Sequence, residues 1–167
     1  TTPAATKFYR SLPDQTARLR QDLLAHRATL EWLPQETIVF DDARAALAFL
    51  RSRYPSARRW VAGFSFGSAI AARLSAAEPD VERVILVAPP VRNRDFAPMR
   101  TWPKPKLVLQ GTNDDQCPMA ELTPEFESWA EPKTLVTIEG AAHFFDAKLG
   151  PFGDRLKQEL APAVEAS

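Results

Sequence analysis

The sequence predicts an α/β fold, in which helices flank a mostly parallel sheet. Short apolar runs alternate with longer segments of helical spacing, and two of the runs lead directly into Gly63 and Gly111. Strands covered by helices on both faces read as continuous apolar runs, because each crossover between parallel strands places a helix over the sheet. The 167 residues are enough for one such core.

The first part of the chain is predicted to be mainly helical. Apolar residues at helical spacing between residues 14 and 33, ended by Pro34, predict one helix. A short strand is predicted at Thr37–Phe40, after which Asp41 and Asp42 can cap a second helix that ends at Tyr54-Pro55. The first helix carries the stripe Leu19, Leu23, His26, Leu30 and Leu33, and the second buries Ala43, Ala46, Leu47 and Leu50.

From Trp60 onward, strands and helices alternate regularly. The alternation is what successive crossover connections in a parallel sheet require. In chain order, we expect a strand at Trp60–Ala62, a helix at Ser68–Ala77, strands at Val84–Ala88 and Leu107–Leu109, a helix at Met119–Trp129, a strand at Leu135–Ile138, and a closing helix marked by Phe152, Leu156 and Leu160.

Composition argues against several classes of partner. Lysine plus arginine equals aspartate plus glutamate at 21 each, so no net field attracts nucleic acid or an anionic membrane. No apolar run reaches the roughly 18 residues of a membrane span, and the chain does not begin like a signal sequence. The single cysteine, Cys117, argues against a disulfide framework or a cysteine-rich metal site. We therefore expect a cytoplasmic protein without a metal.

The segment Gly63-Phe64-Ser65-Phe66-Gly67 has the pattern G-x-S-x-G and stands where a strand turns into a helix. Such a turn holds the serine in a strained conformation, and the flanking glycines keep side chains out of the crowded space. The free N–H groups at the start of the next helix favour developing negative charge. Ser65 is therefore a candidate nucleophile. The alternative is a glycine-bounded turn with an idle serine.

A nucleophilic serine needs a base and an acid that orients the base. His143 follows a predicted strand, at the edge where sites in parallel sheets gather, whereas His26 lies on an apolar helical stripe. Asp114 follows the predicted strand Leu107–Leu109 through a glycine turn, and its neighbour Asp115 is the alternative acid. Both aspartates also suit a simple turn. Serine, acid and histidine then follow the chain order of α/β-hydrolases.

The stretch from Asp41 to the end resembles small, lidless bacterial α/β-hydrolases related to dienelactone hydrolases and serine esterases. The resemblance rests on Gly63–Gly67, Leu86–Pro90, Gln110–Asp114 and Gly140–Phe145. It implies an α/β-hydrolase-type sheet and the roles of nucleophile, acid and base for Ser65, Asp114 and His143. It also implies that the backbone N–H of Phe66 supplies half of the oxyanion hole, and that no cofactor is needed.

The first 40 residues do not match this group. We therefore predict an N-terminal helical segment, residues 1–40, packed on a hydrolase core of residues 41–167 within a single domain. The group's usual early strands and its loop with the second oxyanion donor do not occur in the sequence, which suggests an N-terminally truncated fold. Unless Thr37–Phe40 covers the resulting sheet edge, we expect self-association through it.

The predicted function is hydrolysis of a carboxylic ester or a related small acyl compound. Phe64 and Phe144 flank the candidate residues and either line an apolar acyl pocket or pack around the site. Because fold and site do not fix a substrate, peptide or thioester cleavage is an alternative. Since loss of one oxyanion donor costs on the order of a hundredfold to a thousandfold in turnover, a catalytically silent or partner-dependent fragment is the other alternative.

Overall fold

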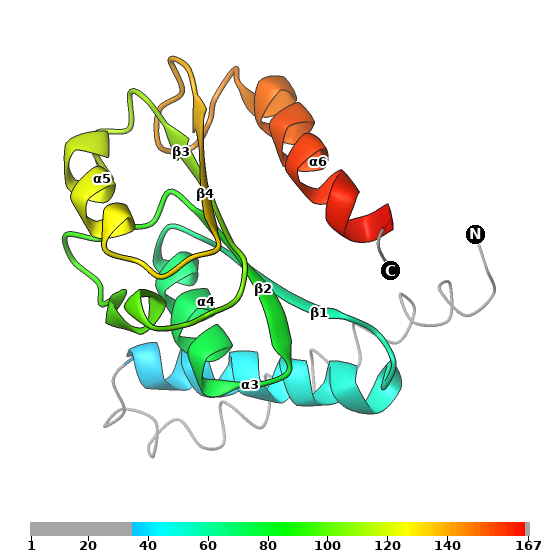
Figure 1. Ribbon diagram of the computed structural model, residues 1–167. Helices are drawn as coiled ribbons and strands as arrows, with labels where there is room; N and C mark the ends of the chain where they lie inside the picture. Colours follow the sequence, from blue (N-terminus) through cyan, green and yellow to red (C-terminus); the bar gives the residue numbers. More distant parts are fainter. Residues whose placement is uncertain (1–34, 166–167) are drawn as a thin grey trace, which may run out of the picture. The chain divides into compact units, whose positions relative to one another are not determined.

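The computed structural model describes residues 35–165, which contain a four-stranded parallel sheet with helices on both of its faces (Figure 1). The sequence folds this way because apolar runs supply strands that are covered on both sides. The predicted α/β class and mostly parallel sheet are confirmed. The strands are β1 (Arg59–Phe64), β2 (Val81–Val87), β3 (Lys106–Gly111) and β4 (Lys133–Ile138), in the spatial order β1-β2-β3-β4 with every neighbouring pair parallel.

The helices α4 (Phe66–Ala77) and α5 (Met119–Glu127) lie on one face of the sheet, and α6 (Leu149–Glu165) lies on the other (Figure 1). α4 packs against β1 and β2, whereas α6 packs against β3 and β4. A short 3-10 helix, η1 (Ala97–Arg100), lies between β2 and β3. The predicted closing helix is confirmed: its residues Phe152, Leu156 and Leu160 pack against the buried cluster formed by Ile85, Ala88, Leu107, Leu109, Val136, Ile138, Ala141 and Phe145.

The strand predicted at Thr37–Phe40 is wrong, because these residues belong to the helix α3 (Gln35–Arg53). A short apolar run cannot distinguish strand from helix by itself, and here it continues directly into alanine- and leucine-rich sequence that favours helix. Phe40 and Leu47, both buried and seven residues apart, fall on one face of α3. The helix predicted after Asp42 lies within α3, but Asp41 and Asp42 do not cap it, because α3 begins at Gln35. Of the residues expected to be buried, Leu47 is buried, whereas Ala46 and Leu50 are exposed.

The contacts divide the chain into two compact units, residues 1–41 and 42–167, and the boundary falls within α3. The predicted helix at residues 14–33 lies outside the described residues. The packing of residues 1–40 on the core therefore stays a prediction.

Arginines of α3 tie the helix to the segment between α4 and β2. Arg44 donates to Glu78 at 2.9 Å, and Arg51 donates to Glu78 at 2.7 Å and to Asp80 at 2.7 Å. The hydrogen bonds from Arg51 lower the pKa of both carboxyl groups and raise the pKa of the guanidinium. These ion pairs hold the C-terminal part of α3 on the second unit.

β1 is an edge strand of the described sheet. The residues of β1 are only partly buried: Ala62 is exposed, and Phe64 is 40% exposed. The neighbouring strand β2 is more deeply buried, and all of β3 is buried. One side of β1 therefore offers backbone groups that no strand among the described residues pairs with.

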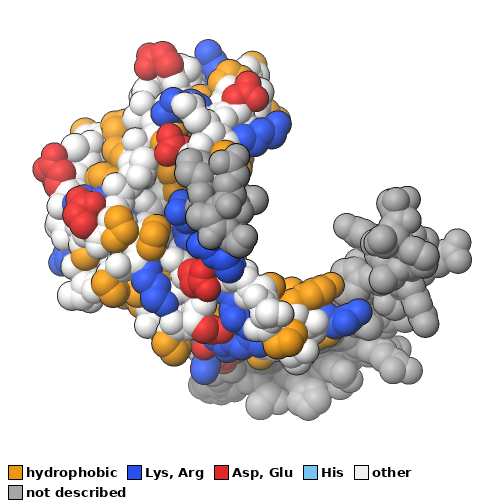
Figure 2. All heavy atoms as spheres, turned by 45° about the vertical axis from the view of Figure 1, so that its right-hand side comes forward, with side chains coloured by type: hydrophobic (Ala, Val, Ile, Leu, Met, Phe, Trp, Pro, Cys, Tyr) orange, Lys and Arg blue, Asp and Glu red, His pale blue; other side chains and the backbone are white. Residues whose placement is uncertain are grey.

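The surface agrees with the balanced charge of the sequence. Positive and negative side chains alternate over the face shown in Figure 2 and form no large area of one sign. Among the helices of residues 35–165, none combines the length and the apolar character that crossing a bilayer requires.

Candidate active site

Ser65 stands at the sharp turn between β1 and α4. Its φ of 49° and ψ of −122° lie in a backbone region that residues with a side chain rarely adopt. A Cβ atom on Gly63 would lie 2.0 Å from the carbonyl oxygen of Gly67, so the turn closes only because residue 63 has no side chain. The prediction that both flanking glycines keep side chains out of a crowded space is therefore confirmed for Gly63 and wrong for Gly67, where a Cβ would meet open space.

The backbone around Ser65 also presents hydrogen-bond donors. Phe66 is the first residue of α4, so its N–H has no acceptor within the helix. Ser68 donates both its N–H and its hydroxyl to the carbonyl of Ser65, at 2.9 and 2.6 Å, which fixes the first turn. The Phe66 N–H and the positive end of the helix dipole therefore lie beside the serine.

The loops that follow β3 and β4 are locked together at the same end of the sheet. A Cβ on Gly111 would lie 2.3 Å from the carbonyl oxygen of Ala141, which shows how closely the two backbones approach. Asn113 donates its N–H to that carbonyl at 2.9 Å, and Gly140 donates to the Thr112 hydroxyl at 2.8 Å. The loop carrying Asp114 and the loop carrying His143 are thus held in one arrangement.

Ser65, His143 and Asp114 form a continuous chain of hydrogen bonds. The Nε2 atom of His143 lies 3.0 Å from Ser65 Oγ, and its Nδ1 atom lies 2.9 Å from Asp114 Oδ2. His143 is 3% exposed and Asp114 is 4% exposed, so water screens these contacts little. The acceptor-only carboxylate places the imidazole proton on Nδ1, which leaves the Nε2 lone pair facing the serine. The alternative acid, Asp115, is exposed and does not contact His143.

The Asp114 carboxylate is held by donors on both oxygens. Oδ1 accepts the backbone N–H groups of Gln116 and Cys117, each at 2.9 Å. Oδ2 accepts the Gln110 side-chain amide at 3.0 Å in addition to His143. Four donors therefore fix the orientation of the carboxylate.

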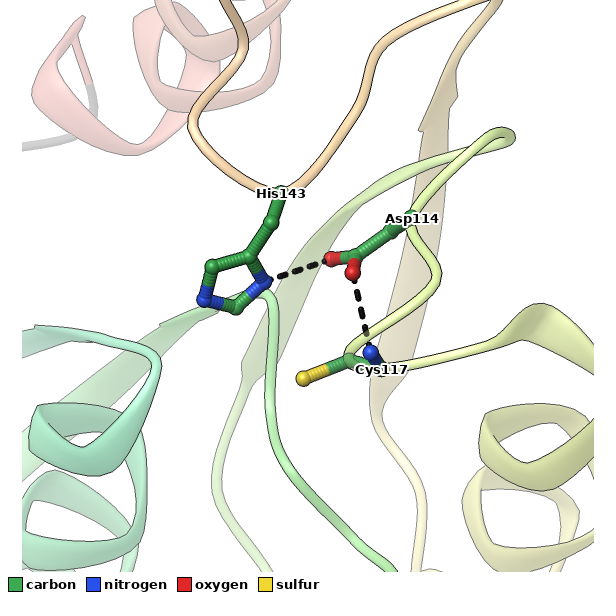
Figure 3. Close-up of side chains that lie close together, drawn as sticks. All are labelled: Asp114, Cys117 and His143. Carbon is green, nitrogen blue, oxygen red and sulfur yellow. Dashed lines mark hydrogen bonds and ion pairs between the residues drawn. The ribbon is translucent and has the colours of Figure 1, made fainter.

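Asp114, Cys117 and His143 also lie within metal-ligand reach of one another, with one atom of each inside 4.8 Å (Figure 3). Their donor atoms are already engaged, however. The Cys117 thiol donates to the carbonyl of Ala88 at 3.3 Å, and burial together with the Asp114 charge raises its pKa to about 12. The close approach of the three side chains therefore follows from the hydrogen bonds that they make within the site.

An open pocket of about 400 Å³ borders the hydrogen-bond chain. The aromatic residues expected to contact substrate lie elsewhere: the Phe64 and Phe144 rings flank the His143 ring, with centroids 5.1 and 5.0 Å away, and neither lines the pocket. Phe144 is 61% exposed. The pocket is lined instead by Ser65, Phe66, Pro90, Arg92, Asn93, Arg94, Asp115, Gln116, Cys117 and His143.

Two parts of this site were not assigned to it from the sequence. The polar wall formed by Arg92, Asn93 and Arg94 comes from the loop after β2, and the basic pair Arg92 and Arg94 is by sequence alone more typical of a solvated face than of a site. Arg94 stacks over the Phe66 ring at 5.0 Å. Gln110 was also missed. A polar amide directly after the apolar run Leu107–Leu109 and directly before Gly111 is the signal that points to it.

Several solved structures similar to this chain are described as α/β-hydrolases or as homologues of them. A serine hydrolase homologue from Coxiella burnetii is 29% identical with a TM-score of 0.72, and covers 77% of this chain and 61% of its own. A putative α/β-hydrolase from Agrobacterium tumefaciens is 26% identical, with a TM-score of 0.70 and the same coverage. A lidless serine hydrolase from Xanthomonas campestris is 30% identical with a TM-score of 0.67, and the match covers 74% of this chain and 56% of that protein. The described residues have an α/β-hydrolase fold.

Relatives found by sequence match two different parts of the chain. Over 128 residues, an uncharacterized protein of Rickettsia prowazekii is 30% identical, and the match covers 71% of this chain and 54% of that protein. The UreD urease accessory protein family matches residues 1–51. Pseudomonas putida UreD is 56% identical over 59 residues, which are 35% of this chain and 21% of UreD. The chain thus spans about half the length of the Rickettsia protein and about a fifth of the length of UreD.

Proposed function

We propose that the chain is a serine hydrolase that cleaves carboxylic esters or related small acyl compounds. The observation that carries the proposal is the hydrogen-bond chain, with Ser65 Oγ 3.0 Å from His143 Nε2 and Asp114 Oδ2 2.9 Å from His143 Nδ1. The strained φ of 49° at Ser65 supports it, because strain of this kind gathers at functional turns. In this proposal the three residues are the catalytic triad.

In the first half of the reaction, Ser65 Oγ attacks the carbonyl carbon while its proton passes to His143 Nε2. The carbonyl electrons move to the oxygen, and the Phe66 N–H donates to the resulting oxyanion. Asp114 stabilises the imidazolium through Nδ1. When the intermediate collapses, the bond to the leaving alcohol breaks, and the alcohol takes the proton from His143.

In the second half, water replaces the serine as nucleophile. His143 removes a proton from a water molecule as its oxygen attacks the acyl-enzyme, and the bond to Ser65 then breaks. The serine regains its proton from His143, and the carboxylic acid leaves. The open pocket beside Ser65 gives both water and a small acyl compound access to the serine. The chemistry of these steps uses only the side chains and backbone of this chain.

A fluorophosphonate probe tests the proposal directly, because it reacts with activated serines. We expect mass spectrometry to locate one adduct, on Ser65. Ser65→Ala removes it, and Ser128→Ala, which alters an exposed serine on the protein surface, leaves it in place. A folded sample without any adduct at Ser65 contradicts the proposal.

The substrate and the compartment follow from the same reasoning. We propose a small uncharged or singly charged acyl compound, because the pocket is open and the chain has no net charge. We propose the cytoplasm as location from the use of a single cysteine. Immunoblots of fractionated cells expressing the protein test the location.

A second candidate function is favoured by the UreD match over residues 1–51. We propose as this alternative that the chain acts with a protein partner, in a role accessory to urease, and that the hydrolase fold serves as a scaffold. Binding of the full chain to purified urease subunits, measured by biolayer interferometry, tests it. Ser65→Ala should bind as the wild type does, because this role does not use the nucleophile. Lack of binding by both rejects the alternative.

A further inference from the structure

Gln110 is a fully buried amide that directly follows three apolar residues of β3. It is 0% exposed and follows Leu107–Leu109 along β3. Burying an amide is unfavourable unless it makes hydrogen bonds that replace those with water. A leucine or methionine in this place would suit the strand better. The amide must therefore meet a specific need at this position.

The orientation of the Gln110 amide is fixed by its two partners. Nε2 donates to Asp114 Oδ2 at 3.0 Å and to the carbonyl oxygen of Cys117 at 2.7 Å. Because both partners are acceptors, only the NH2 group fits between them. The other end of the amide, Oε1, is buried, and no group within residues 35–165 donates a hydrogen bond to it. An unsatisfied buried acceptor is destabilising, so the arrangement favours the bond to Asp114 over the stability of the fold.

We propose that Gln110 is a positioning residue that holds the Asp114 carboxylate for His143; its kinetic consequences rest on the proposed hydrolase function. Asp114 Oδ2 shares its negative charge between the Gln110 amide and the imidazole N–H. The amide also prevents the carboxylate from rotating about its Cβ–Cγ bond. Gln110 thus sets both the direction and the strength of the hydrogen bond that orients His143.

Removing the amide has a definite expected effect. Without Gln110, only the imidazole donates a side-chain hydrogen bond to Oδ2, and the charge on this oxygen is concentrated on that bond. A stronger acceptor stabilises the imidazolium, so His143 should take up its proton at higher pH. The carboxylate should also move more, because Oδ2 then keeps the imidazole as its one side-chain donor beside the two backbone donors on Oδ1.

The other titratable and charged groups near the site stay unchanged in such a variant. The Cys117 thiol lies within 4.8 Å of the Asp114 and His143 donor atoms. Asp115, Arg92 and Arg94 line the adjoining pocket. A change in pH dependence on substitution of Gln110 therefore reports the contact with Asp114.

The first test uses Gln110→Met, which keeps the shape of the side chain and removes the donor. We expect the rate of Ser65 labelling by a fluorophosphonate to fall about tenfold to a hundredfold, as for loss of one hydrogen bond to a charged group. The acid limb of the pH–rate profile should move to higher pH. Gln158→Met, an exposed glutamine of α6, should leave the rate and the profile unchanged.

The second variant, Gln110→Glu, separates positioning from packing. Its ionised form repels Asp114, whereas its neutral form can donate an O–H to Oδ2. The ratio of the labelling rates of Gln110→Glu and Gln110→Met should therefore rise as the pH falls. If both variants have the wild-type pH dependence, or if the ratio does not change with pH, the proposal is overturned.

A readout without turnover keeps the proposal separate from the hydrolase function. The chain has only two histidines, His26 and His143, so a His26→Gln background assigns the imidazole signals. We expect the low-field Nδ1–H proton resonance of His143 to shift in Gln110→Met. A resonance at the wild-type position overturns the role of Gln110. An unlabelled wild type with a shifted resonance in the variant rejects the hydrolase function alone.

Discussion

The backbones of Gly111 and Ala141 approach so closely that no side chain fits between them. A Cβ atom at residue 111 would lie 2.3 Å from the Ala141 carbonyl oxygen and 2.9 Å from its carbon. This contact joins the loop after β3 to the loop after β4, and the two loops carry Asp114 and His143. The geometry of the proposed triad therefore depends on a glycine that takes no part in the chemistry.

Gly111→Ala should separate these two loops. We expect the free energy of unfolding to fall by about 1–3 kcal/mol, as for other overpacked buried sites. Labelling of Ser65 should slow by about a hundredfold, because a small displacement of the base is enough to disrupt catalysis. Urea unfolding and probe labelling measure the two effects. Gly150→Ala is the control, since a Cβ there meets open space; equal behaviour of the two variants contradicts the prediction.

The strain at Ser65 predicts a difference between two inactive variants. Glycine adopts positive φ without the steric strain that a Cβ atom adds, whereas alanine at φ 49° keeps that strain. Ser65→Gly should therefore be more stable than Ser65→Ala by about 1 kcal/mol, and neither should react with the probe. Chemical unfolding of both proteins measures the difference. A Ser65→Ala protein as stable as Ser65→Gly would show that the turn is not strained.

Cys117 should be unreactive in the folded protein. Its pKa is raised from 9.0 to about 12, mainly by burial, so the thiolate at pH 8 is about a thousandfold scarcer than for an ordinary thiol. The contribution of the protonated thiol to the free energy of unfolding is fully present below pH 9 and is lost as the pH rises toward 12. Reaction with Ellman's reagent at pH 8 should be at least a hundredfold faster after unfolding in urea. Cys117→Ser gives the blank; rapid reaction of the native protein contradicts the prediction.

The sequence predicted the sheet well because each strand contains a short apolar run. β2 and β3 were predicted at Val84–Ala88 and Leu107–Leu109, within these strands or next to their ends. Thr37–Phe40 was predicted wrongly, since a run with only three apolar residues fits either period and only the surrounding chain decides. Nothing in the periodicity revealed that Phe64 and Phe144 flank the His143 ring outside the pocket, because loop conformation directs these rings.

The candidate site was partly predictable for a physical reason. Residues at the carboxyl ends of parallel strands meet at one edge of the sheet, so Ser65, Asp114 and His143 could be grouped from their positions alone. Spacing favoured Asp114 over Asp115 but left Asp115 as an alternative, and in the structure Asp114 is buried whereas Asp115 is exposed. The hydrogen bonds to backbone N–H groups of Gln116 and Cys117 distinguish them, and these exist only in the folded loop.

The ion pairs of Arg51 predict an acid-sensitive attachment of α3. Because the pKa values of Glu78 and Asp80 are lowered from 4.5 and 3.8, their contribution to stability is complete above pH 4.5 and is lost as the pH falls. Arg51→Gln should lower the melting temperature at pH 7, and the difference from wild type should shrink below pH 4. Thermal unfolding across this range measures it. Arg53→Gln is the matched control, because Arg53 stacks over Tyr54 instead.

The free edge of β1 predicts self-association. Residues 37–40 are helical, so they add no strand beside β1, and the described sheet ends there. An unpaired edge with exposed Ala62 can pair with the same edge of a second copy. Sedimentation velocity should therefore show dimers or larger species that increase with concentration.

Ala62→Lys should weaken this association, because a charge on an edge strand opposes pairing. Ala76→Lys adds the same charge to the exposed surface of α4 and should leave the association unchanged. The comparison separates strand pairing from a general effect of charge, since both variants add one lysine to the chain. A wild type that stays monomeric at every concentration would mean that another part of the protein covers the edge.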